Sequence, residues 1–211
     1  NGSVISNTFD ALNRLTGTYL KTSAGSVINS HAYGLDDAGR RIRQTRTDGG
    51  YADYEYDPSG QLITARGKEL GGVTNRLLEQ FGYAYDAAGN LARRTNNALV
   101  QTLSVDSLNQ LTSGSRTGTL TVAGNTTASA TSATVKDNSN TAVSAVLYND
   151  GTFARAGITP LNGANTFVAA ATDASGRSSS QSITVDLPAS QAFSYDGNGN
   201  LLADGKRSFV Y

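Results

Sequence analysis

The 211-residue sequence contains no cysteine, no methionine and no tryptophan. Without cysteine the chain can form no disulfide, no thiol nucleophile and no cysteine-ligated metal site. Its 17 basic and 17 acidic residues cancel to a formal net charge of +0, so no excess of positive charge favours a nucleic acid. No apolar run approaches the ~20 residues that a membrane-spanning helix needs, and we expect no membrane insertion.

Few residues are available for catalysis or metal binding. The only histidine, His31, comes just before a predicted strand at Tyr33, and we expect it to be an ordinary strand or loop residue. The segment 196–200 alternates oxygen ligands as a calcium loop does, but Arg207 stands at the twelfth position, where an EF-hand needs a bidentate glutamate. We expect a bare turn there. The sequence therefore predicts no catalytic residue, no cofactor and no metal site.

A motif that recurs six times is the main feature that is present. It consists of an aromatic or aliphatic residue, Asp, two variable residues, Gly or Asn, a polar residue and, in five of the six copies, Leu. Asp favours the first position of a type I turn, and Gly or Asn tolerates the positive φ that closes a three-residue hairpin loop with a bulge. Each copy therefore predicts the tip of one β-hairpin. The turn residues are Asp10 and Asn13, Asp36 and Gly39, Asp57 and Gly60, Asp86 and Gly89, Asp106 and Asn109, and Asp196 and Gly199.

The residues before the turns have the period of β-strands. Tyr54 and Tyr56 are two positions apart, which places their rings on one face of a strand, and the same period precedes Asp86. The predicted fold class is all-β, with stacked β-hairpins that carry an inserted small β-sandwich. Two further tyrosines, Tyr51 and Tyr148, lie at or beside turn pairs, and we expect these two to be the most exposed.

The spacing of the motif indicates where the insertion lies. Successive aspartates are 26, 21, 29, 20 and 90 residues apart, and removing about 70 residues from the last interval restores the spacing of the others. Segment 118–187 also has only 7 charged residues in 70, against 27 in the other 141. Short alternating runs in it are separated by turn signals such as Asp150-Gly151, which predicts a small sandwich. We therefore divide the chain into a hairpin region 1–117, an inserted sandwich 118–187 and a continued hairpin region 188–211.

The hairpin motifs resemble a known family. Segments 81–91 and 193–201, with the cores Tyr85-Asp-Ala-Ala-Gly-Asn-Leu91 and Tyr195-Asp-Gly-Asn-Gly-Asn-Leu201, are similar to the Tyr-Asp repeats of bacterial RHS, or YD-repeat, proteins. Segment 54–62 resembles a further Tyr-Asp repeat of this kind, and segments 8–16 and 105–112 resemble the Asn-bearing variant of the same repeat. The resemblance covers roughly 1–117 and 188–211. It implies a ribbon of hairpins that forms part of a spiral shell, as in insecticidal toxin complexes, polymorphic bacterial toxins and teneurin receptors.

The same resemblance draws attention to Asp57-Pro58-Ser59-Gly60. RHS proteins that enclose a toxin carry a pair of Asp-Pro-x-Gly motifs at which aspartyl autoproteolysis occurs. The second motif is absent, because Glu79-Gln-Phe-Gly82 stands near its expected place. Proline is also favoured at the second position of a type I turn. We therefore expect an ordinary turn at this position rather than a cleavage site.

The insert resembles a different module. Segments 118–124, 148–153, 161–177 and 183–187 are similar to a bacterial immunoglobulin-like domain of the glucodextranase domain B type. Such domains accompany glycoside hydrolases, but hydrolysis needs two positioned carboxylates. The aspartates of the insert all fall at predicted turns or strand ends with no paired context, so we expect no enzymatic activity. They are Asp137, Asp150, Asp173 and Asp186.

These inferences predict a non-catalytic structural and interaction segment of a large RHS protein that is secreted or lies on the bacterial cell surface, with the insert as spacer or adhesion module. Two alternatives keep the fold. One is part of a toxin-encapsulating shell, and the other is a self-assembling extracellular fibre, because an open ribbon leaves unpaired strand edges. The expected partners are other repeats of the same polypeptide, glycans or surface proteins, and further copies in a homo-oligomer or filament. Nucleic acid is not expected.

Overall fold

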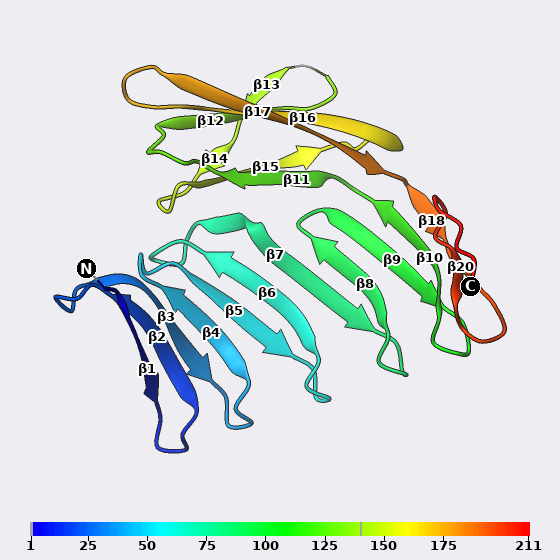
Figure 1. The fold of residues 1–211 in the computed structure, drawn as a ribbon, viewed down its shortest axis with the longest axis horizontal. Helices are drawn as coiled ribbons and strands as arrows, with labels where there is room; N and C mark the ends of the chain where they lie inside the picture. Colours follow the sequence, from blue (N-terminus) through cyan, green and yellow to red (C-terminus); the bar gives the residue numbers. More distant parts are fainter. Residues whose placement is uncertain (1, 140) are drawn as a thin grey trace. The chain divides into compact units, whose positions relative to one another are not determined.

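The structure is a computed structural model that describes residues 2–139 and 141–211. The described residues form β-strands and no helix, which confirms the predicted all-β fold class (Figure 1). Accordingly, this part of the chain has no helix that could cross a membrane. The chain divides into two compact units, residues 1–80 and 81–211. The strands of the repeat hairpins follow one another in an antiparallel sheet, from β1 to β10 and then β18.

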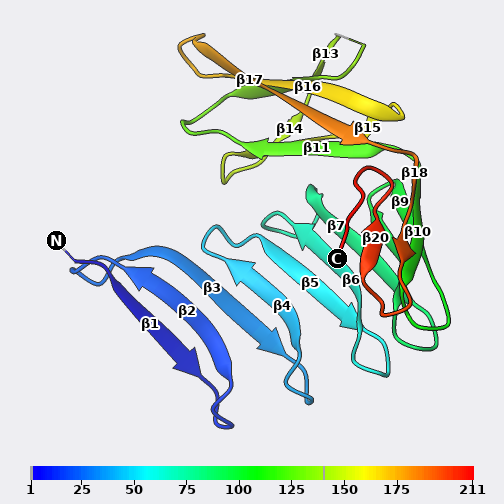
Figure 2. The same ribbon diagram turned by 45° about the vertical axis from the view of Figure 1, so that its right-hand side comes forward.

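The first unit consists of consecutive antiparallel hairpins. The repeat turns that begin at Asp10, Asp36 and Asp57 lie at one end of these hairpins, and the connections from β2 to β3 and from β4 to β5 lie at the other (Figure 1, Figure 2). Strand β7 begins in this unit and continues into the second. The strands are β1 (Val4–Phe9), β2 (Leu15–Lys21), β3 (Val27–Leu35), β4 (Arg41–Arg46), β5 (Tyr51–Tyr56), β6 (Leu62–Lys68) and β7 (Asn75–Tyr85).

Burial in the first unit is that of a single layer. Among its described residues no apolar side chain is buried, and the tyrosines and leucines of its strands are mostly half-buried. Cross-strand pairs, such as Tyr54 opposite Ala65, place side chains next to each other on one face. Pairs of this kind, rather than an apolar core, are the unit of stabilisation in such a sheet.

The second unit continues the hairpins with β8 (Leu91–Asn96), β9 (Leu99–Val105) and β10 (Leu111–Thr117). Strand β18 (Ser190–Ala192) pairs with β10, with Gly114 opposite Gln191. The insert therefore leaves the sheet from one strand and returns to it in the neighbouring strand. A separate two-stranded sheet follows, made of β19 (Ser194–Tyr195) and β20 (Leu201–Ala203).

The insert is built from two sheets. A three-stranded sheet has the order β11-β15-β14, and a four-stranded sheet has the order β13-β12-β16-β17 (Figure 1). All seven strands lie inside segment 118–187, whereas the compact units divide at residue 80, so the predicted three-part division stays a prediction. The strands are β11 (Leu120–Asn125), β12 (Ser132–Lys136), β13 (Ala142–Ser144), β14 (Val146–Leu147), β15 (Thr152–Ile158), β16 (Gly163–Thr172) and β17 (Ser178–Leu187).

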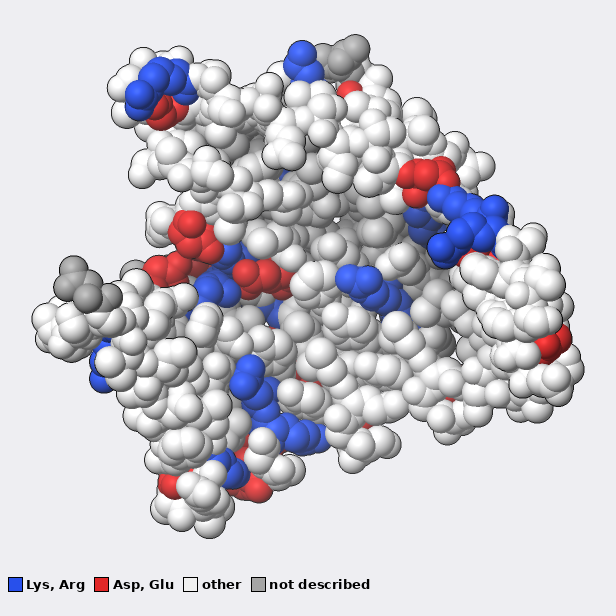
Figure 3. All heavy atoms as spheres, viewed as in Figure 1, with Lys and Arg blue, Asp and Glu red and all other residues white. Residues whose placement is uncertain are grey.

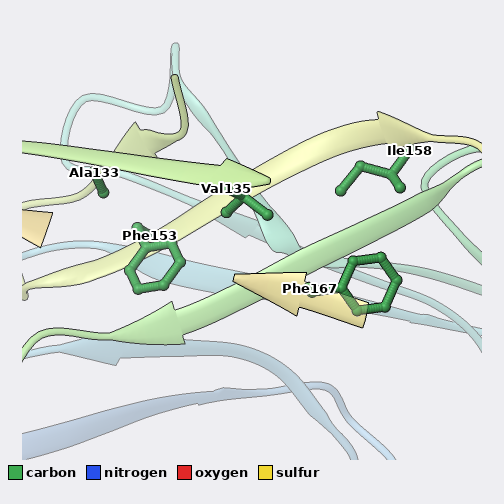
Figure 4. Packing of buried hydrophobic residues seen from close by; sticks show 5 residues of the cluster. All are labelled: Ala133, Val135, Phe153, Ile158 and Phe167. Atoms are coloured by element: carbon green, nitrogen blue, oxygen red, sulfur yellow. The ribbon is translucent and has the colours of Figure 1, made fainter. Parts of the chain in front are cut away.

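The two sheets of the insert enclose the apolar core of the described chain. Its side chains come from β12, β15 and β16, so both sheets contribute to it (Figure 4). The buried cluster consists of Ala133, Val135, Phe153, Ile158 and Phe167. Tyr148 is also buried, with 5% of its surface exposed, so the expectation of an exposed ring was wrong. A neighbouring turn pair does not determine whether a side chain is exposed, because burial depends on the packing around it.

Candidate functional site

The six repeat turns share one backbone geometry. In each, the amide of the fourth residue donates to the Asp carbonyl over 3.0–3.1 Å, and the Asp amide donates to the carbonyl of the fifth residue over 2.9–3.0 Å. The fourth residue has φ between 60° and 86°, which glycine adopts freely and asparagine at small cost. The strand register shifts beside each turn, as a bulge requires. The turns begin at Asp10, Asp36, Asp57, Asp86, Asp106 and Asp196.

The Asp side chain adds a second set of hydrogen bonds to each turn. Its Oδ1 accepts the backbone amide of the fifth residue over 2.8–3.0 Å in all six turns. Where the fifth residue is Arg or Asn, its side chain also donates to Oδ2, as Arg40 does over 2.7 Å and Asn90 over 3.0 Å. These bonds favour the ionised carboxylate. The side chain of Arg40 lowers the pKa of Asp36, and that of Asn90 lowers the pKa of Asp86.

The fifth residue of a turn also reaches the next turn along the sheet. Arg14 Nη1 donates to the carbonyl of Asp36 over 3.0 Å, and Arg40 Nη1 donates to the carbonyl of Asp57 over 3.4 Å. In the second unit, Asn90 Nδ2 donates to Asn109 Oδ1 over 2.9 Å. This row of linked turns was missed at the level of sequence, where the fifth position was noted only as polar. The available signal was that all six copies have Arg, Gln or Asn at that position.

Two tyrosine hydroxyls connect a strand to the hairpin before it. Tyr56 donates to a backbone carbonyl of β4 over 2.8 Å, and Tyr195 donates to a backbone carbonyl of β10 over 3.0 Å. Tyr51, which was expected to be exposed, is half-buried, and the guanidinium of Arg43 lies 4.1 Å from the centre of its ring. These three tyrosines therefore serve contacts within the sheet and do not form a free aromatic platform.

A cluster of charged side chains lies in the first unit at the end of the hairpins away from the repeat turns. Arg76 is only 1% exposed, and its guanidinium donates to Glu69 Oε1 over 2.5 Å and to Glu79 Oε1 over 2.9 Å. Arg46 of β4 donates to the other oxygen of Glu79 over 3.0 Å. Both carboxylates are therefore held by guanidinium groups, and the cluster connects β4 and β7 with the segment that directly follows β6. No pattern in the sequence pointed to this cluster.

The insert is fixed to the sheet by contacts at its two ends. Arg116 Nη2 donates to the carbonyls of Leu161 and Leu187, over 2.7 Å and 2.5 Å. The backbone amide of Arg116 donates to the carbonyl of Ala189 over 2.9 Å, and the amide of Ala189 donates to Asn162 Oδ1 over 2.8 Å. One arginine of β10 thus binds both the interior and the exit of the insert.

Gly118 makes the entry to the insert unusually close. Its φ is +82°, and a Cβ atom at this position would lie 1.9 Å from the carbonyl oxygen of Ala98. No side chain larger than hydrogen fits there without moving the backbone. The close contact at Gly118 and the hydrogen bonds of Arg116 together fix the insert to β9 and β10 of the second unit.

A groove of about 740 Å³ lies on the insert. Apolar residues from both sheets line it, among them Val122, Phe153, Phe167 and Ile183, together with serine and threonine side chains. Its two charged residues, Asp173 and Arg177, pair with each other over 2.7 Å. The groove can therefore take an uncharged, partly apolar group; among its described lining residues the one carboxylate is that of Asp173, which is paired.

The residues considered earlier for catalysis or calcium have structural contacts. His31 Nδ1 lies 3.0 Å from Gln44 Nε2, and the ring is half-buried in the sheet. Asp57, in the Asp-Pro sequence, accepts the amide of Gln61 over 2.8 Å, as the other turn aspartates accept theirs. Asp196 caps its own turn.

The four aspartates of the insert are each bound by neighbours. Asp137 accepts from Ser139 and Arg155, Asp150 from Thr152, and Asp173 from Arg177. Asp186 forms an ion pair with Lys206. Residues 2–139 and 141–211 contain no group of three or more acidic, histidine or cysteine side chains that could hold a metal ion. On the face that Figure 3 shows, basic and acidic side chains lie in small groups rather than in one large patch of a single sign.

Comparisons with known proteins give a match at the level of structure. No protein-family model matches the chain. No curated protein matches it either. Among solved structures, the chain is similar to a chain in the crystal structure of TcdB2-TccC3-Cdc42, with a TM-score of 0.49 and 17% sequence identity. The alignment covers 93% of this chain and 9% of that one, so this chain spans about a tenth of the length of its structural neighbour.

Proposed function

We propose that the chain is a non-catalytic structural and interaction segment of a large RHS-type protein that is secreted or lies on a bacterial cell surface. In this proposal the stacked hairpins form a stretch of wall, and the insert is a spacer or adhesion module attached to it. The motif resemblance supports the family, and the linked turns support the structural role. Three of the turns are connected to the next by the side chain at the fifth position, that of Arg14, Arg40 or Asn90.

One observation carries the proposal. Strand β10 pairs directly with β18 although the whole insert lies between them in the sequence, with Ser113 opposite Ala192 and Ser115 opposite Ser190. The chain therefore rejoins the hairpin sheet beside the strand from which it left, adding β18 as the last strand of that sheet. Segments that enter and leave a domain at adjacent points are the usual sites of tolerated domain insertion. The insert can thus add a surface without interrupting the wall.

The test compares three proteins: the full chain, a variant in which 118–187 is replaced by a short Gly/Ser linker, and the insert alone. All three are applied to a glycan array and to bacterial and host cell surfaces. If the insert is an adhesion module, the full chain and the insert should bind a glycan or a cell surface, and the linker variant should not. A spacer predicts that none of the three binds, while the linker variant keeps its strand content in circular dichroism.

Two results would contradict the proposal. One is a linker variant that unfolds, since the wall would then depend on the insert. The other is hydrolysis of any array glycan by the full chain, since the carboxylates of the insert are all engaged by neighbours, as for Asp137 and Asp173.

A further inference from the structure

The outer edge of β17 differs from the other edges of the insert. In the described part of the chain, β17 is the last strand of its sheet and pairs only with β16. The ladder between them runs without a register shift from Gly163 opposite Leu187 to Thr172 opposite Ser178. By contrast, β13 has three residues, β14 has two, and β11 has a register shift between Leu120 and Val122. The ten residues of β17 thus form the one long and regular edge among these strands.

Strand β17 also lacks the features that usually block an edge. Natural sheets protect their edges with lysine, proline, bulges or short strands. From Ser178 to Val185 the strand has no charged residue and no proline, and Ser178 to Thr184 are all exposed. The charges at its two ends are already paired within the chain, Arg177 with Asp173 and Asp186 with Lys206, so the edge between them has no unpaired charge that would repel a second copy. In an antiparallel copy centred on Ile183, Arg177 of one copy would lie opposite Ala189 of the other and Asp186 opposite Ser180, so no like charges face each other.

Ile183 supplies an apolar contact at the middle of this edge. It lies opposite Phe167 in the ladder, so its side chain is on the inner face of the sheet, yet 57% of its surface is exposed. Phe167, by comparison, is only 5% exposed. The difference arises because Ile183 borders the open groove, where no further strand covers it. An added strand beside β17 would cover this side chain.

We propose that two copies of the chain associate through their β17 edges, as an antiparallel pair with a two-fold axis at Ile183. In this register Ile183 of each copy lies opposite Ile183 of the other. Directly opposite side chains in an antiparallel pair are about 4.5–5.5 Å apart, so the two exposed isoleucines would contact each other. The pairing joins the two four-stranded sheets into one continuous sheet and closes the side of each groove.

The interface is of the isologous kind, in which the same patch of both copies is used. Such a contact closes on itself and gives a dimer, not a fibre. This inference rests on the proposed interaction role of the insert and names a second copy of the chain as its partner. It does not require a glycan or a surface protein, so the two can fail separately.

The first test measures the mass of the full chain by sedimentation velocity across a wide range of concentration. We expect a reversible monomer–dimer equilibrium. The substitution Ile183→Lys places two like charges opposite each other and should weaken the dimer at least about tenfold. The control is Val143→Lys, which adds the same charge to the other edge strand of the same sheet at a residue that is 41% exposed. This control should leave the equilibrium unchanged.

A second test reads the register directly. The chain has no cysteine, so Ile183→Cys introduces a single thiol. A short thiol-to-thiol cross-linker should couple two copies of this variant in high yield and should couple Val143→Cys poorly. Equal yields for the two variants would overturn the register, and a wild-type chain that stays monomeric up to its solubility limit would overturn the dimer. Normal glycan or cell binding by a monomeric Ile183→Lys variant would show that the proposed function survives without it.

Discussion

The entry to the insert gives the sharpest prediction. Replacing Gly118 by alanine adds one methyl group, which would lie 1.9 Å from the carbonyl oxygen of Ala98. Real Cβ contacts are essentially never shorter than 3.0 Å, so the two backbone segments must separate by at least the difference, about 1.1 Å. The residue also has φ of +82°, which an alanine adopts only at a cost.

Two contributions add up in this variant. The left-handed conformation costs about 1–2 kcal/mol for a residue with a Cβ atom. Forcing an extra carbon into a packed site costs about 1–3 kcal/mol more. We therefore expect Gly118→Ala to lower the free energy of unfolding by about 2–5 kcal/mol. For a chain of this size, each kcal/mol shifts the melting temperature by roughly 2–4 °C.

The control is Gly157→Ala. Gly157 has the same φ of +82°, but nothing lies within 4 Å of the position of its Cβ atom. This variant should lose only the conformational contribution, about 1–2 kcal/mol. Urea titrations followed by circular dichroism, together with calorimetry, give both values. Equal losses in the two variants would refute the close contact between Gly118 and Ala98, and with it the fixed entry of the insert.

Three further predictions concern the charged cluster, the acid limb of stability and the core. Arg76→Leu should lower the free energy of unfolding by about 3–5 kcal/mol, because it leaves Glu69 and Glu79 without their buried partner. The control is Arg43→Leu, which removes the exposed ion pair with Asp53 and should cost at most about 1 kcal/mol. Hydrogen bonds from the backbone amide and the side chain of Arg207 lower the pKa of Asp204 from 3.8 to about 2. Its contribution to the free energy of unfolding is therefore complete above about pH 4 and is lost as the pH falls through 2. In Asp204→Asn, the free energy of unfolding should change less with pH over this range. Phe167→Ala should cost about 3–5 kcal/mol and raise hydrogen exchange across β12, β15 and β16, and an unchanged exchange pattern would contradict its place in the core.

Local features of the fold could be predicted from the sequence, because the residues that determine them are adjacent. The spacing from Asp86 to Gly89 is enough to indicate a turn, since a positive φ and an Asp cap need no distant partner. The interval of 90 residues predicts an insertion in the same direct way, and the three-part division of the chain stays a prediction. The alternating tyrosines predict the strands before the turns, and turns and strands together predict the all-β class.

Contacts between distant segments could not be predicted in this way. Arg76 and Arg46 lie thirty residues apart in the sequence and bind the same carboxylate, that of Glu79, only because the end of β4 lies near the start of β7. Arg116 reaches Leu187 across the whole insert, and no local signal marks it among the arginines. The burial of Tyr148 and the exposure of Ile183 likewise depend on which sheet covers which face. Side-chain burial is a property of tertiary packing, so it cannot be predicted from the neighbouring residues in a single sequence.

The central claim is that the hairpin wall of the second unit is complete without the insert. The most direct measurement is hydrogen exchange of the variant in which a short linker replaces 118–187. The pairing of Gly114 with Gln191 predicts that amides of β8, β9 and β10 stay as protected as in the full chain, and that β18 still protects its side of β10. Loss of protection throughout these strands would show that the wall depends on the insert and would contradict the account.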